Sequence, residues 1–261
     1  MPEAAPAFET LAGRHAVVTG GGRGIGLAIA KRLAGLGSRV TVMGRNAGLL
    51  EEAAAALPKT RALPCDVTDE TAVGRAFERA AQAAGAPDIL INNAGAALSA
   101  PLGKTTLRQF QDMLEVNLIS AFLCSRAVLP AMTAAGFGRI VNIASTAGLR
   151  GAAYITGYCA AKHGMVGLTR ALAVETAALG ITVNAVCPGY TETDMLDQAI
   201  ETISAKTGCS QAEARAALIE TNPQGRLVQP EEVADAVAWL CAPGSASMTG
   251  QAIAVAGGAV T

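Results

Sequence analysis

A glycine-rich turn between a strand and a helix is the feature that most limits the folds open to this chain. Residues 15–19 form a short apolar run typical of a buried strand, and residues 27–36 repeat apolar side chains at helical spacing. Between them lies Gly20-Gly21-Gly22-Arg23-Gly24-Ile25-Gly26. Such a turn brings backbone N–H groups and a helix N-terminus to one point, and glycine allows a pyrophosphate to approach closely. The sequence therefore predicts a phosphate site in an α/β fold.

Strands and helices alternate along the rest of the chain. We expect further strands at residues 39–43, 61–65, 89–91, 140–144, 181–186 and 252–255. We expect helices at residues 47–57, 70–84, 107–135 with an interruption at Pro130, from about Tyr158 to Leu179, and 230–240. This order predicts a single-domain, Rossmann-type, doubly wound parallel sheet of about seven strands, with helices on both faces. Pro64 places the third strand at an edge, where a missing N–H is tolerated.

The domain organisation is simple. We expect residues 1–12 to be a flexible leader and residues 13–261 to be one domain. Residues 195–224 are its least regular part, with short helices expected at 197–206 and 211–221.

We expect this irregular segment to be a mobile lid over a substrate cleft. Ser210 and Glu213 make a capping box at the start of its second helix. Apolar residues of the first helix recur at helical spacing and are expected to face the cleft: Leu196, Ile200 and Ile203. Residues near the catalytic stretch are expected to line the rest of it: Leu149, Tyr154 and Tyr190.

Composition excludes several classes of protein. Of the 261 residues, 51% are hydrophobic and 16% are charged, so the chain can bury a large core. The net charge of -1 argues against a nucleic acid or an anionic membrane as the main partner. The six cysteines form no C-x-x-C pair, and we expect no bound metal. The N-terminus has no signal-peptide pattern and no uncharged apolar run spans a membrane, so we expect a cytoplasmic protein.

Residues 145–162 carry the chemistry. Ser145 follows the apolar run 140–144, at the end of a strand where open α/β sheets place their ligands. Tyr158 and Lys162 are four residues apart and so share one face of a helix. A lysine ammonium beside a phenol is expected to lower the phenol pKa from its usual value near 10. The serine can hold a substrate oxygen while the tyrosine exchanges a proton with it, which suits interconversion of a ketone and an alcohol.

The second strand indicates which cofactor is preferred. An NAD site places an acid after this strand to hold the ribose 2′-OH, whereas arginine accommodates a 2′-phosphate. Here Gly44 and Arg45 follow the strand, and no acid appears before Glu51. Arg23 in the glycine-rich turn adds a second cation. This pattern favours NADP(H).

Three motifs occur in an order that resembles the short-chain dehydrogenase/reductase family, and the resemblance covers nearly the whole chain. They are the spacing Gly20-x-x-x-Gly24-x-Gly26, the tetrapeptide Asn92-Asn93-Ala94-Gly95, and the set Ser145, Tyr158 and Lys162. The resemblance implies reversible carbonyl reduction with NADP(H) by a homotetramer or homodimer. It implies a catalytic role for Asn117, with a distorted helix and a water relay there, and a second role for Lys162 at the nicotinamide ribose. It also implies that the cofactor contacts Gly20, Gly22, Arg23, Gly24, Ile25, Gly26, Gly44, Arg45, Asp66, Val67, Asn93, Ala94, Gly95, Tyr158, Lys162, Pro188, Gly189, Thr191 and Thr193.

The substrate is less sharply indicated. Residues 184–195 and 222–227 resemble 3-oxoacyl-thioester reductases and aromatic polyketide ketoreductases. Sugar and cyclic-alcohol dehydrogenases of the same family look similar and remain an alternative. An alternative of another class is an NADP-binding regulator without catalysis, although a regulator has no need of Ser145, Tyr158, Lys162 and Asn117. We expect a small carbonyl or alcohol substrate, with thioesters among the candidates.

Overall fold

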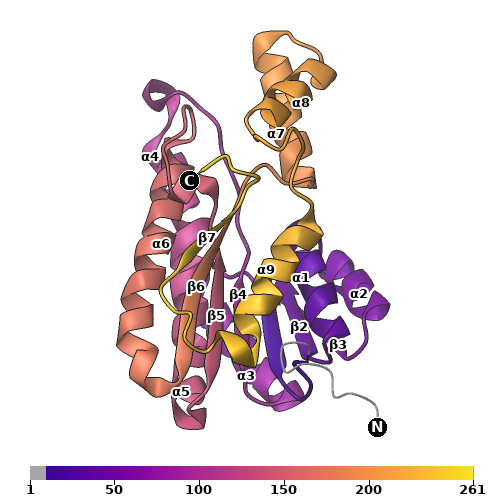
Figure 1. Cartoon of the computed structure of the whole chain (residues 1–261), viewed down its shortest axis with the longest axis vertical. Coiled ribbons are helices and arrows are strands. Elements are labelled where there is room, and N and C mark those ends of the chain that lie inside the picture. The colour runs from indigo at the N-terminus through magenta and orange to yellow at the C-terminus, as the bar shows by residue number, and fades with distance from the viewer. Residues whose placement is uncertain (1–9, 261) are drawn as a thin grey trace.

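The computed structural model describes residues 10–260, which form one parallel sheet of seven strands in the order β3-β2-β1-β4-β5-β6-β7 (Figure 1). The strands are β1 (His15–Thr19), β2 (Arg39–Gly44), β3 (Thr60–Pro64), β4 (Ile89–Asn92), β5 (Gly138–Ile143), β6 (Ile181–Pro188) and β7 (Ala252–Val255). The predicted doubly wound fold is confirmed, and β3 with Pro64 is an edge strand as expected.

Helices connect successive strands and cover both faces of the sheet. They are α1 (Gly24–Gly35), α2 (Ala47–Ala56), α3 (Glu70–Ala84), α4 (Leu107–Leu114), α5 (Ser120–Ala135), α6 (Thr156–Thr176), α7 (Asp194–Thr207), α8 (Gln211–Glu220) and α9 (Pro230–Cys241). One apolar core joins α1, α2 and α9 to one face, and a second joins α3, α5 and α6 to the other. Neighbouring strand residues point to opposite faces, so Val18 lies in the first core and Val17 in the second.

The strand order reverses beside β1, and this places the ligand crevice. β1 pairs with β2 on one side and with β4 on the other. The connections from β1 and β4 therefore leave in opposite directions, and a crevice opens outside the carboxyl ends of these strands. The glycine-rich turn follows β1 at this point, and residues 93–95 follow β4. The residues expected to bind the cofactor are thus brought to one edge of the sheet.

The amino-terminal boundary differs from the expected one. Residues 1–9 lie outside the described part of the chain, so the leader is described only from residue 10. Leu11 is 4% exposed, packs in the first core, and donates its N–H to the carbonyl oxygen of Leu36 at 2.9 Å. Residues from Leu11 onward therefore belong to the packed domain.

The interruption expected at Pro130 lies elsewhere. Pro130 is inside α5, and the break falls earlier, at a π-helical turn (Glu115–Ile119) between α4 and α5. The stretch Leu107–Ala135 is long and apolar enough, by length and composition, to cross a membrane. In this fold α5 packs on the sheet through Leu123, Cys124, Val128 and Met132, as a core helix does.

Helices α7 and α8 form a hairpin that projects beyond the carboxyl ends of the strands (Figure 1). The segments that lead into and out of the hairpin pair through one isolated β-bridge, between Thr191 and Val228. The hairpin has an apolar cluster of its own, separate from both sheet cores, formed by Leu196, Ile200, Ala214, Leu218 and Leu227, with Ile203 packed against it. The expectation that Leu196, Ile200 and Ile203 face the cleft is therefore wrong, because these side chains pack against α8.

Since the hairpin has its own cluster, its helices can loosen without disturbing the sheet. We predict that Ile200→Ala speeds amide hydrogen exchange in residues 194–220 and changes the melting temperature by no more than about 2 °C. The control, Ile29→Ala in the fully buried face of α1, should cost about 2–5 kcal/mol and unfold the whole domain earlier. An equal drop in melting temperature for both variants would show that the hairpin unfolds together with the sheet.

Candidate active site

The glycine-rich turn leaves the first amides of α1 free to bind an anion. A Cβ atom at Gly26 would overlap the carbonyl oxygen of Gly20, so only glycine allows α1 to pass this close to β1. Gly20 and Gly24 have φ of 65° and 51°, which glycine adopts without strain. Arg23 is the N-cap of α1, and its side chain makes no capping hydrogen bond. The N-terminal N–H groups of α1 are therefore available for phosphate oxygens.

A second helix N-terminus lies beside this turn. Thr193 is the N-cap of α7 and also makes no side-chain cap. A Cβ atom at Gly24 would lie 3.3 Å from Cγ2 of Thr193, so the start of α1 lies close to the start of α7. The hydroxyl of Thr191 donates to the Gly189 carbonyl at 3.0 Å, and that of Thr193 to the Thr191 carbonyl at 3.2 Å. The segment after β6 is thereby folded over the glycine-rich turn, with Pro188 as the last residue of β6.

The turn after β4 is tied to the glycine-rich turn by side-chain hydrogen bonds. The Asn93 amide donates to the carbonyl oxygens of Thr19 at 2.9 Å and Gly20 at 3.2 Å. The Thr19 hydroxyl accepts from the N–H groups of Asn93 and Ala94, each at 3.0 Å. The Asn93 amide is thus directed to the backbone. A cofactor contact by Asn93 would have to come from its other polar atoms.

The two arginines expected at a 2′-phosphate have different surroundings. Arg45 is exposed directly after β2, close enough to Asp66 to help lower its pKa. The hydrogen bonds from the N–H and hydroxyl of Thr68 are the larger causes of that lowered pKa. Arg23 instead pairs with Asp194, the first residue of α7, at 3.1 Å. Arg45 is therefore the arginine better placed for a phosphate on the ribose.

The remaining nucleotide-contact candidates have small or buried side chains. Gly44 ends β2, and Gly22 approaches α2 so closely that a Cβ atom would lie 3.2 Å from Cβ of Leu49. Ile25 packs against the first core, and Val67 is 7% exposed. Together with the two uncapped helix starts, these residues fit a dinucleotide lying across the carboxyl ends of β1, β2 and β4.

The four expected catalytic residues lie in one cluster. Ser145 follows β5, Tyr158 and Lys162 lie on the first two turns of α6, and Ser145 is close enough to Tyr158 to act on its pKa. The Lys162 ammonium is 5.6 Å from the Tyr158 ring centroid and donates to the Ile143 carbonyl at 2.8 Å. A Cβ atom at Gly95 would lie 2.6 Å from Oδ1 of Asn117 and 3.7 Å from Nζ of Lys162, so Asn117 faces the same space.

Asn117 sits in the π-helical turn between α4 and α5 and is fully buried. Its amide donates to the carbonyl oxygens of Ala96 at 2.8 Å and Met113 at 3.0 Å. A side chain that bonds the carbonyl four residues earlier competes with the helical ladder, which widens the turn. The helix distortion implied by the family resemblance is present at this residue.

A buried polar network holds α5 and α6 beneath this cluster. The Asn92 amide on β4 donates to Ser125 of α5 at 3.1 Å and to Oδ1 of Asn142 on β5 at 2.8 Å. The Asn142 amide in turn donates to Thr169 of α6 at 2.8 Å. All four side chains are at most 3% exposed. Buried networks of this kind fix the relative positions of their elements, because breaking one bond leaves a polar group without a partner.

The charge states in the cluster differ from those expected. Burial raises the pKa of Tyr158 to about 12, and the Ser145 side chain opposes only part of this rise. Burial also lowers the pKa of Lys162 to about 8. The expectation of a lowered Tyr158 pKa is wrong for this structure, because burial raises this pKa and Lys162 is not among the groups that shift it. At neutral pH Tyr158 is a neutral phenol that can donate a proton.

Two groups in the cluster were not identified from the sequence. The Ile143 carbonyl binds Lys162, and Cys187 on β6 lies near enough to act on the Lys162 pKa. Burial raises the pKa of the Cys187 thiol to about 11, so it is neutral there. The signal that could have found both is their position at the ends of β5 and β6, beside the strand end that carries Ser145.

The chain matches the protein-family model described as Enoyl-(Acyl carrier protein) reductase over residues 20–260. It is 41% identical to Granaticin polyketide synthase putative ketoacyl reductase 1 of Streptomyces violaceoruber over 93% of this chain and 92% of that protein. It is 41% identical to the cis-4-hydroxycyclohexanecarboxylate dehydrogenase of Sinomonas cyclohexanicum, over 96% and 98%. A crystal structure of an actinorhodin polyketide ketoreductase variant with NADPH superposes with a TM-score of 0.92 at 40% identity, covering 94% of this chain and 97% of that one.

The buried ammonium should make stability depend on pH in a defined direction. The unfolded lysine has a pKa near 10.4, and the native Lys162 has a pKa of about 8. The cost of burying the charge is therefore fully present below about pH 8 and disappears as the pH rises toward about 10.4.

We predict that Lys162→Met raises the free energy of unfolding of the cofactor-free protein at pH 7 by roughly 1–3 kcal/mol. This gain should shrink as the pH approaches about 10. Urea unfolding at several pH values measures both, with the exposed Lys31→Met as the control that shows neither effect. A gain that grows with pH would contradict the assigned charge state.

Proposed function

Because the chain belongs to the short-chain dehydrogenase/reductase family and interconverts ketones and secondary alcohols with NADP(H), we propose that Ser145, Tyr158, Lys162 and Asn117 are its catalytic residues. The observation that carries this proposal is their meeting at one point: a neutral phenol close to a serine, beside a buried ammonium and a buried amide. A regulator without catalysis has no use for this costly burial of Lys162.

Tyr158 and Ser145 act on the substrate oxygen. The bound nicotinamide cofactor supplies the hydride. The Ser145 hydroxyl and the Tyr158 phenol both donate hydrogen bonds to the carbonyl oxygen, which orients it and stabilises the negative charge that develops there. Tyr158 then gives its proton to this oxygen during reduction and takes it back during oxidation. The raised pKa of Tyr158 keeps the phenol protonated at neutral pH, which suits the reductive direction.

Lys162 and Asn117 support the proton transfer. One ammonium hydrogen of Lys162 is engaged by the Ile143 carbonyl, which leaves two for a ribose hydroxyl and for solvent. A phenolate at Tyr158 would be stabilised by this ammonium and reprotonated through it. The Asn117 amide donates to the Ala96 carbonyl, and its Oδ1 accepts from the Ala96 N–H at 3.3 Å, beside Gly95. These bonds hold Asn117 next to Lys162, where we propose that it supports the proton relay.

The cofactor would lie across the two uncapped helix starts. The amides after Gly22 and Arg23 would bind the pyrophosphate, and Arg45 would bind the 2′-phosphate. The other residues that we propose for contacts with the nucleotide are Gly20, Gly24, Ile25, Gly26, Gly44, Asp66, Val67, Asn93, Ala94, Gly95, Tyr158, Lys162, Pro188, Gly189, Thr191 and Thr193.

The substrate that we propose is a 3-oxoacyl thioester or a bulky cyclic ketone. The similar proteins named as a ketoacyl reductase and a cyclohexanecarboxylate dehydrogenase support these two classes. The α7–α8 hairpin would act as a lid over the substrate, and Leu149, Tyr154 and Tyr190 would line the pocket. Tyr154 and Tyr190 are 63% and 44% exposed, so both rings are open to a ligand. A sugar or cyclic-alcohol dehydrogenase is the second candidate.

We also propose a homotetramer or homodimer that works in the cytoplasm. Large apolar side chains are exposed on three helices: Ile119 and Phe122 beside the start of α5, Val174 on α6 and Trp239 on α9. Burying them against another copy would stabilise an assembly. All six cysteines are free thiols, which suits a reducing compartment.

Removing the phenol hydroxyl should abolish proton transfer alone. We predict that Tyr158→Phe lowers turnover by at least about 100-fold with an active ketone, while NADPH binding, followed by fluorescence, stays within about threefold. The control is Thr133→Val, which removes an exposed hydroxyl near the end of α5 and should keep turnover within about threefold. Near-normal turnover in Tyr158→Phe would refute the assignment.

Substrate size should decide catalytic efficiency, because contacts far from the carbonyl help to position it. We predict that acetoacetyl-CoA or a bicyclic ketone is reduced with a kcat/KM at least about tenfold above that of acetone. All three are compared at one pH and one NADPH concentration. A preference for acetone would contradict both the lid and the proposed substrate classes.

A further inference from the structure

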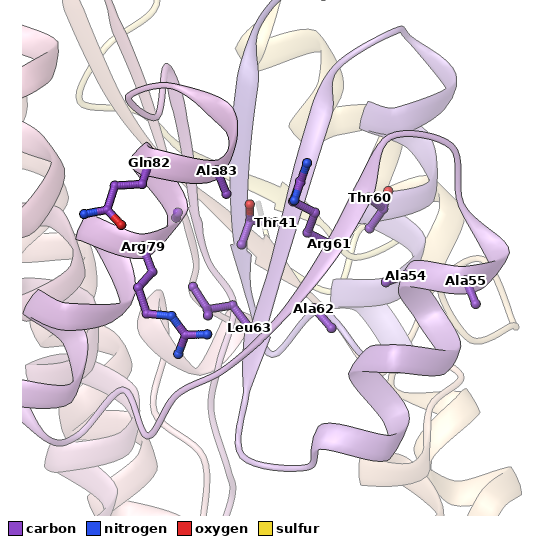
Figure 2. Close-up of a pocket in the computed structure, with 11 residues that line it drawn as sticks. Thr41, Ala54, Ala55, Thr60, Arg61, Ala62, Leu63, Arg79, Gln82 and Ala83 are labelled. Atoms are coloured by element: carbon purple, nitrogen blue, oxygen red, sulfur yellow. The ribbon is translucent and has the colours of Figure 1, made fainter.

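A groove of about 690 Å³ runs along the open edge of the sheet at β3, with the end of α3 on one face and the end of α2 on the other (Figure 2). Eleven residues line it: Thr41, Ala54, Ala55, Thr60, Arg61, Ala62, Leu63, Arg79, Ala80, Gln82 and Ala83. On each face the helix end next to β3 carries alanines, which leave the edge of the strand uncovered. The volume of the groove is within the range of small-molecule sites.

This groove is separate from the candidate active site. Its β3 lining begins at Thr60, the first residue of the strand, and its helical lining comes from the last turns of α2 and α3. The catalytic cluster lies beyond the carboxyl ends of the strands, beside β5 and α6. A ligand in the groove would therefore not contact Ser145, Tyr158 or Lys162.

The charged side chains of the groove are both cationic. Arg61 extends from β3 and Arg79 from α3, so they approach the groove from different elements (Figure 2). No carboxylate lines the groove. Neither arginine belongs to an ion pair among residues 10–260, whereas Arg14, Arg32, Arg126 and Arg226 of the same chain all do. Two guanidinium groups are thus left with their donors available to an anion.

Donors to an anion also come from N–H groups at the edge of the groove, because the Thr41 hydroxyl on its floor is already engaged by His15. Nδ1 of the buried His15 is 2.6 Å from the Gly85 carbonyl and must donate to it, so in the neutral ring Nε2 accepts from the Thr41 hydroxyl at 2.8 Å. Burial lowers the His15 pKa, which keeps this ring neutral. β3 is an edge strand, so alternate backbone N–H groups on its outer side have no partner strand. Gln82 supplies a further amide.

We propose that this groove binds a small organic bisphosphate on the α3 side of β3, with one phosphate at Arg61, the other at Arg79, and the carbon skeleton against Ala80 and Ala83. Guanidinium groups bind phosphate oxygens in pairs, and the two arginines lie on different walls, so two anionic groups are needed to engage both. An acidic peptide added to the edge of the sheet fits less well. β3 has only five residues and ends in Pro64, which has no N–H to donate.

The experiment uses the two histidines of the chain as reporters. His15 contacts Thr41 in the floor of the groove, whereas His163 is exposed on α6. The probe is fructose 1,6-bisphosphate, added to the protein saturated with NADP⁺ so that the nucleotide site is filled. Imidazole nitrogen NMR signals are followed, and His163→Gln identifies which signals belong to His15. We expect a saturable shift of the His15 signals below about 5 mM probe and no shift of those from His163.

Three variants locate the site. Arg61→Gln and Arg79→Gln should each weaken binding at least about fivefold, because each removes one charge-assisted contact. The control, Arg75→Gln, removes an exposed charge of α3 that does not line the groove, and should change binding by less than about twofold.

Four outcomes would overturn the proposal. They are no His15 shift up to about 20 mM probe, equal weakening by all three variants, binding as tight for fructose 6-phosphate as for the bisphosphate, or tighter binding of a hexaglutamate peptide. None of these measurements depends on the catalytic residues. Failure here would therefore leave the assignment of the active site untouched.

Discussion

The close passage of α1 over the backbone of Gly20 is the constraint on which the ligand site depends. Because Gly26 has no side chain, α1 begins directly beside the end of β1 and points its uncapped amides into the crevice. The Asn93 amide then ties the turn after β4 to the same backbone. That turn carries Gly95 past Asn117 and Lys162. The absence of a side chain at Gly26 thus links the glycine-rich turn to the cluster that contains Asn117 and Lys162.

Burial dominates the chemistry of the catalytic end. A neutral phenol and an ammonium that gives up its proton more readily than usual are both consequences of removing water from around Tyr158 and Lys162. The free energy for holding this arrangement comes from elsewhere, chiefly from two apolar cores on the faces of the sheet and from the amide network of Asn92 and Asn142. The site is kept in place by residues that never touch a ligand.

Much of this could be predicted from the sequence because the signals are local. The alternation of apolar runs predicts the strands, the glycine spacing predicts the turn, and the capping box of Ser210 and Glu213 marks the start of α8. The predictions that failed concern properties that depend on the three-dimensional surroundings of a residue. The pKa of Tyr158 is set by its burial, and the four-residue spacing to Lys162 carries no information about burial. The stripe of Leu196 and Ile200 is helical in sequence, but the partner it meets is set by the fold of residues 194–220.

The self-contained packing of the α7–α8 hairpin has a consequence for how such enzymes diversify. Its interior is closed by a handful of side chains that share no core with the sheet, and it joins the body at the bridge of Thr191 and Val228. A change inside the hairpin has to be compensated only within the hairpin. The hairpin can therefore accumulate substitutions, or be exchanged between related proteins, while the glycine-rich turn and both sheet cores stay unchanged.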